Sequence, residues 1–109
     1  MPADPDAVMR GARGRVLPPQ ALAGLREAFA AEVADRLPRL QAVRPGASAE
    51  VLAQALRDAH SLGSSAVVLG EPAASRTARA VEAALTAGDV GPVPGQVREL
   101  TVLLAAWQA

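Results

Sequence analysis

The chain has 109 residues, of which half are hydrophobic, so one domain with a single core is expected. Eleven arginines balance eleven acidic residues and no lysine is present, so the sequence offers no basic surface of the size that nucleic acid or an anionic membrane needs. The absence of cysteine excludes disulfides, thiolate catalysis and cysteine-based metal sites.

Residues 1–17 contain prolines, glycines and three arginines, which is typical of a short flexible or partly helical N-terminal arm. They lack the basic-then-apolar order of a signal peptide. No apolar run in the chain approaches the roughly 20 residues that a membrane span requires. We therefore expect a cytoplasmic protein with an arm at 1–17 and a helical domain at 18–109, and no membrane association.

Four helices are predicted after the arm, because apolar residues recur at steps of three and four. The first begins at Pro19 and ends before Pro45, and the second runs from an N-cap at Ser48 to Gly70. The third follows to about residue 87, and the last begins near Gln96. Their inward faces are expected to be Leu22, Leu25, Phe29, Val33, Leu37 and Leu40; Leu52, Leu56, Ala59, Leu62, Ala66 and Leu69; Ala74, Ala78, Val81 and Leu85; and Val97, Leu100, Leu103, Leu104 and Trp107. Short loops between such helices predict an all-α fold, an antiparallel up-down four-helix bundle.

His60 is the only histidine, and it lies beside the apolar stripe of the second predicted helix. A helical side chain leans toward the N-terminus and covers the preceding turn, so residues 63 and 64 decide whether the imidazole is covered. Gly63 and Ser64 leave it open, although a glycine inside a helix costs about 1 kcal/mol. Val67 and Val68 continue this strip as an apolar surface that a docking partner could use.

The segment from His60 to Gly70 resembles the histidine phosphotransfer (HPt) domain of multistep phosphorelays. The family's pattern has a hydrophobic residue two positions after the histidine, then small residues, and a glycine ten positions after it. The residues that match this pattern are Leu62, Ser65, Ala66 and Gly70. The resemblance spans roughly residues 19–108, and it departs from the family at Gly63, where the family has lysine, and at Ser64, where the family has glycine.

The resemblance implies that His60 accepts a phosphoryl group from the phospho-aspartate of a response-regulator receiver domain and passes it on. Glu82, on the following helix, matches a family position that orients the imidazole. Arg57 and Arg79 could supply the cation that the family's lysine provides. The implied partners are a receiver domain, a hybrid histidine kinase or both. We expect a monomeric phosphocarrier that is not itself an enzyme, with no cofactor and no metal.

Other interpretations of the same residues remain open. Without the family's lysine, the chain could be a pseudo-HPt adaptor that docks a receiver or kinase domain without carrying phosphate. A metal- or haem-binding bundle has too few ligands, because Glu82 alone stands near the single histidine. A hydrolase is disfavoured since no nucleophile elbow is present. Arg57, Arg79 and Glu82 could also be ordinary solvated surface charges.

Overall fold

The computed structural model describes residues 18–108, which form four α-helices and one short 3-10 helix. The helices are α2 (Pro19–Gln41), α3 (Ala49–Val68), α4 (Pro72–Thr86) and α5 (Val93–Leu103), followed by η1 (Ala105–Trp107). No strand occurs between residues 18 and 108, so the predicted all-α class is confirmed. The N-terminal arm expected at 1–17 lies outside the described residues.

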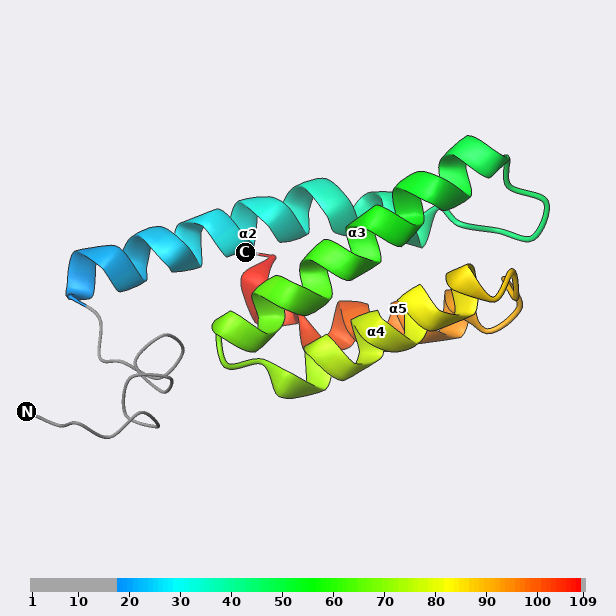
Figure 1. Cartoon of the computed structure of the whole chain (residues 1–109). Coiled ribbons are helices and arrows are strands. Elements are labelled where there is room, and N and C mark those ends of the chain that lie inside the picture. Colours follow the sequence, from blue (N-terminus) through cyan, green and yellow to red (C-terminus); the bar gives the residue numbers. More distant parts are fainter. Residues whose placement is uncertain (1–17, 109) are drawn as a thin grey trace, which may run out of the picture.

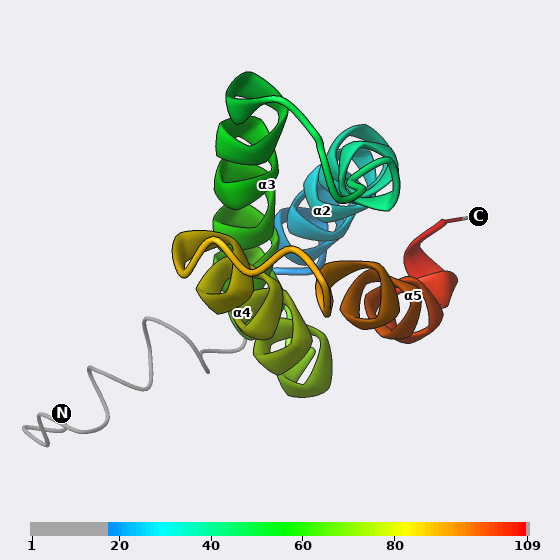
Figure 2. The same cartoon turned by 90° about the vertical axis from the view of Figure 1, so that its right-hand side faces the viewer.

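The helices form an antiparallel up-down bundle, as the sequence predicts. Figure 1 shows each helix running opposite to the one before it, with short loops at the two ends. Viewed along the bundle in Figure 2, the four helices surround a common centre. Each helix packs against its two neighbours, in the closed order α2, α3, α4, α5 and back to α2. The face of α3 that points away from α2 and α4 is therefore left without a helical neighbour.

The ends of α3 and α4 follow from local sequence. The Ser48 hydroxyl accepts a hydrogen bond from the Val51 amide at 3.2 Å, which caps the start of α3 as predicted. Gly70 has a φ of 75° just after α3, and Gly88 has a φ of 73° just after α4. Residues with side chains rarely adopt this left-handed conformation, so glycine ends both helices with little conformational strain.

The core is built from small and branched aliphatic side chains with one aromatic ring. Its fully buried members include Phe29, Val33, Leu37, Leu40, Val43, Ala55, Ala59, Leu62, Ala66, Ala74, Ala78, Val81, Val93, Val97, Leu100 and Leu104. The prediction that Leu22 and Leu25 lie in the core is wrong, since Leu22 is 44% exposed and Leu25 is 39% exposed. They lie in the first turns of α2, which extend beyond the rest of the bundle in Figure 1 and have no opposing helix.

The last helix also begins earlier than the sequence suggests, at Val93 instead of near Gln96. Val93 is fully buried in the core, and this burial stabilises the additional first turn of the helix. Proline is well tolerated in the first turn of a helix because its missing N–H would have no helical partner there, so Pro94 does not oppose the early start.

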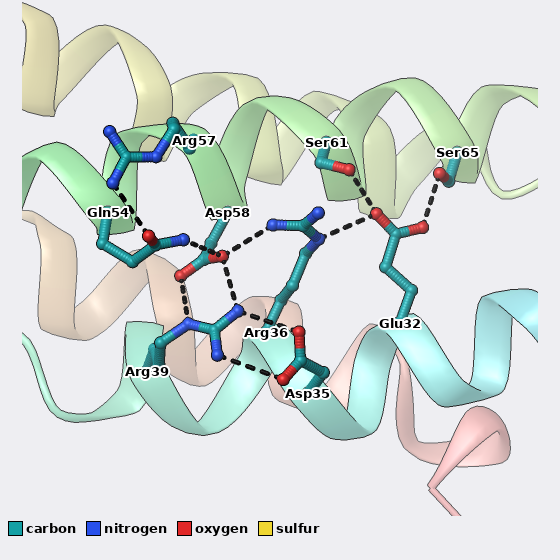
Figure 3. Close-up of polar contacts among 9 residues, drawn as sticks. All are labelled: Glu32, Asp35, Arg36, Arg39, Gln54, Arg57, Asp58, Ser61 and Ser65. Atoms are coloured by element: carbon teal, nitrogen blue, oxygen red, sulfur yellow. Dashed lines mark hydrogen bonds and ion pairs between the residues drawn. The ribbon is translucent and has the colours of Figure 1, made fainter.

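A buried carboxylate, Asp58, joins α3 to α2 (Figure 3). Asp58 is 0% exposed, yet it lies among charged partners. Its oxygens accept hydrogen bonds from Arg36 Nη1 at 2.8 Å, from Arg39 Nε and Nη2 at 2.8 and 2.9 Å, and from Gln54 Nε2 at 3.0 Å. Burial acts to raise the pKa of Asp58, but the hydrogen bonds from Arg39, Gln54 and Arg36 outweigh it and hold that pKa below its usual value.

A second carboxylate extends the same seam toward the C-terminal end of α3. Glu32 of α2 accepts hydrogen bonds from the hydroxyls of Ser61 and Ser65 on α3, the latter at 2.6 Å, and from Arg36 Nε at 3.0 Å (Figure 3). The seam therefore fixes one long edge of α3 against α2 through paired charges and hydrogen bonds instead of apolar contact.

We expect Asp58→Ala to lower the free energy of unfolding by about 3–5 kcal/mol, because it removes the shared acceptor of two guanidinium groups. Asp35→Ala is the matched control, since Asp35 also pairs with Arg39 but its side chain is 64% exposed; little change is expected there. Urea unfolding followed by the fluorescence of Trp107, the only tryptophan, measures both. Equal unfolding midpoints for the two variants would contradict the role given to Asp58.

The lowered pKa also sets the direction of the pH dependence. Ionised Asp58 contributes its full stabilisation above its unfolded pKa of about 4, and the contribution is lost as pH falls through the lower folded pKa. The wild-type protein should therefore lose stability in acid more steeply than Asp58→Asn.

Candidate functional site

The packing of α3 against α4 brings their backbones close together around Gly63. A Cβ atom added to Gly63 would lie 3.5 Å from Ala78 Cβ, 3.5 Å from Arg79 Cγ and 3.7 Å from the Ser75 carbonyl oxygen. The buried Ser75 hydroxyl donates a hydrogen bond to the Gly63 carbonyl oxygen at 2.8 Å. This bond gives the buried hydroxyl a partner and joins α4 to α3 at Gly63.

Gly63 is thus buried, and its expected place on the open surface beside His60 is wrong. The sequence showed that residue 63 has no side chain, but it did not show which way that face of the helix points. In the structure it points toward α4. Ser64, the next residue, is exposed as expected, so it is Ser64 that leaves space next to the imidazole.

The same antiparallel packing places His60 opposite Glu82. One turn back along α3 from Gly63 is His60, and one turn forward along α4 from Arg79 is Glu82. His60 Nδ1 lies 2.9 Å from Glu82 Oε2. The His60 side chain is 68% exposed and that of Glu82 is 31% exposed, so the pair stands at the rim of the bundle with the ring in solvent.

This geometry decides which ring nitrogen is available. An ionised carboxylate can only accept a hydrogen bond, so Nδ1 carries the hydrogen and donates it to Glu82. In the neutral ring, Nε2 then holds an unshared electron pair. The arrangement can therefore present one imidazole nitrogen to solvent as a nucleophile, with a carboxylate behind the ring to stabilise positive charge on it.

Exposed residues lie along α3 on both sides of His60. Val67 is 44% exposed and Val68 is 52% exposed, so the two valines form an apolar surface beyond Ser64, as expected from the sequence. Arg57 is exposed one turn before His60, where its Nη2 donates to Gln54 Oε1 at 2.8 Å. Arg79 is also exposed, on α4.

Between residues 18 and 108, no three histidine, aspartate or glutamate side chains gather as a metal ion would require. Over the same range, no helix is both long and apolar enough to cross a bilayer.

The sequence profile of the Hpt domain matches residues 24–109, well over half of the chain. The chain belongs to the Hpt domain family. Hpt domains are helical phosphocarrier modules that act in histidine phosphotransfer within phosphorelays, and they interact with receiver domains and histidine kinases. A search of curated proteins and a search of solved structures each found no match.

Two residues that hold α3, the helix that carries His60 in this Hpt domain, were not identified from the sequence. Ser75 joins α4 to α3 through its hydrogen bond to the Gly63 carbonyl oxygen. Its spacing of three residues from Ala78 was the available signal that it points inward. Asp58 is fully buried on α3, and its charge gave no signal of an inward position.

We expect Glu82→Ala to move the His60 tautomer equilibrium away from the Nδ1–H form, because the acceptor that holds the Nδ1 hydrogen is lost. Long-range proton–nitrogen correlation spectra of the histidine ring report the tautomer directly. Glu99→Ala, which removes an exposed carboxylate from α5, is the control and should leave the spectrum unchanged. An unchanged tautomer in Glu82→Ala would mean that the contact has no influence on the ring.

Proposed function

We propose that His60 is the phosphoacceptor of this Hpt domain, taking a phosphoryl group from the phospho-aspartate of a response-regulator receiver domain and passing it to another. The observation that carries this proposal is the ring itself, which is 68% exposed while its Nδ1 is engaged by Glu82. Exposure gives a large partner access, and the engaged nitrogen leaves the other one as the nucleophile.

In the proposed transfer, each bond, proton and charge can be assigned to a named group. The Nε2 electron pair forms the new N–P bond while the P–O bond of the phospho-aspartate breaks, and the aspartate carboxylate leaves with the electron pair of that P–O bond. The ring keeps its Nδ1 hydrogen and becomes positively charged, and the Glu82 carboxylate stabilises this charge. The receiver would supply the magnesium ion used in phosphoryl transfer, so this domain acts as a carrier.

The docking surface in this proposal is the exposed strip of α3. Ser64 keeps the approach to the ring free, while Val67 and Val68 offer apolar area that no other part of the described chain covers. Arg57 borders the strip on the other side of His60. A receiver that covers this strip would exclude water from the reacting atoms.

A second candidate is a pseudo-HPt adaptor that docks a partner without carrying phosphate. The observation that favours it is Gly63, which stands where the family has a lysine. Both candidates use the same surface of α3, so only a measurement of phosphate on His60 separates them.

The experiment is phosphoryl transfer from a panel of phosphorylated receiver domains, with acid-labile radiolabel on this chain as the readout. We expect the wild-type protein to acquire label and His60→Gln to acquire none, with equal helix content by circular dichroism. Label that persists in His60→Gln would refute the assignment. Receiver binding by an unlabelled wild-type protein would support the adaptor instead.

Ser64→Arg separates docking from chemistry in the same assay. An arginine at this exposed position would cover the ring against a receiver but not against a small donor such as phosphoramidate. We expect this variant to lose transfer from receivers and to keep labelling by phosphoramidate. Unchanged transfer from receivers would show that the partner does not approach over Ser64.

A further inference from the structure

The stem of the Arg79 side chain lies beside Gly63 at the edge of the site. Its Cγ lies 3.5 Å from the position of a Gly63 Cβ, in ordinary van der Waals contact. Alanine would fit at residue 63 with that spacing, but a longer side chain would compete with the arginine stem for the same space. The absence of a longer side chain at residue 63 therefore leaves the space beside α3 that the stem of Arg79 occupies.

We propose that Arg79 is the phosphoryl-binding cation of this site and that Gly63 makes room for it. This inference rests on the proposed phosphorylation of His60. A phosphoryl group on a side chain carries between one and two negative charges near neutral pH. On Nε2 it would stand close to the Glu82 carboxylate, so an uncompensated site would repel it. A nearby guanidinium offsets this repulsion and donates hydrogen bonds to the phosphoryl oxygens.

The position of Arg79 suits that role. His60 and Gly63 are one turn apart on α3, and Glu82 and Arg79 are one turn apart on the opposing helix. Residues one turn apart on a helix have Cβ atoms about 5–6 Å from each other. The Arg79 Cγ lies beside Gly63, one turn from the ring, and the flexible chain beyond Cγ can bring the guanidinium toward Nε2.

The guanidinium is also available. Within residues 18–108, the ion pairs do not include Arg79, and the adjacent Glu82 carboxylate is engaged by His60. Arg57, the other arginine near the ring, already donates to Gln54 on its own helix. Arg79 is therefore better placed than Arg57 to meet an incoming anion.

The test uses phosphoramidate as donor, which removes receiver docking from the measurement. We expect Arg79→Ala to slow labelling of His60 about tenfold, the effect of losing one charged hydrogen-bond donor at a partly exposed site. Phosphorus NMR titration of the labelled protein should show a higher phosphoryl pKa, because a neighbouring cation favours the dianion. Arg79→Lys should retain most of both effects, and Arg76→Ala, an exposed arginine one turn away on α4, should change neither.

A second pair of variants tests whether the positive charge itself is what matters. Gly63→Lys in the Arg79→Ala background returns a positive charge from α3 and should restore the rate and the phosphoryl pKa. Gly63→Met, of similar length and without charge, should not. If wild-type protein and Arg79→Ala label equally and share one phosphoryl pKa, the inference about Arg79 is overturned while the phosphoacceptor stands. Absence of label in the wild-type protein overturns both proposals.

Discussion

The close antiparallel packing of α3 on α4 around Gly63 fixes everything else about the site. Because the two helices meet at this level, one turn along each of them brings an imidazole opposite a carboxylate, and His60 Nδ1 reaches Glu82 Oε2 at 2.9 Å. A glycine in mid-helix costs about 1 kcal/mol relative to alanine. Alanine would also fit here, but a longer side chain would compete with the stem of Arg79 for the space beside α3. The buried Ser75 hydroxyl joins α4 to α3 at this point by donating a hydrogen bond to the Gly63 carbonyl oxygen.

The opposite edge of α3 is held by different chemistry. There the Asp58 and Glu32 carboxylates join α3 to α2 through arginines and serines (Figure 3). The helix is thus fixed on both sides, by tight packing toward α4 and by a polar seam toward α2. Only its outward strip is free, and His60 lies on that strip. In the proposed transfer, a nucleophile on a helix held in this way would need little reorganisation when a receiver docks.

The sequence predicted the features that depend on periodicity and on local signals. Apolar spacing identified the four helices, Ser48 marked the start of α3, and the lone histidine beside the stripe proved to be exposed. What it could not supply was the extent and orientation of neighbouring helices. Leu22 and Leu25 continue the apolar pattern of α2, yet they are exposed because no helix lies opposite the first turns.

The two other misses share a physical cause. Gly63 was taken as space for a partner, but which helix occupies space beside a glycine depends on the rotation of α3 in the bundle. The burial of Asp58 could not be predicted from its own charge, because two arginines from α2 make that burial possible. Arg36 and Arg39 lie one turn apart in the sequence of α2, but their pairing with α3 requires knowledge of the helix register.

The central claim is that Glu82 holds Nδ1 of His60 and so leaves Nε2 to react. It is tested most directly by finding which ring nitrogen carries phosphorus. Protein labelled with nitrogen-15 in histidine can be phosphorylated and the nitrogen–phosphorus coupling measured by NMR. Coupling to Nε2 alone is the predicted result, and phosphorus on Nδ1, or a ring that takes up none, would contradict the account.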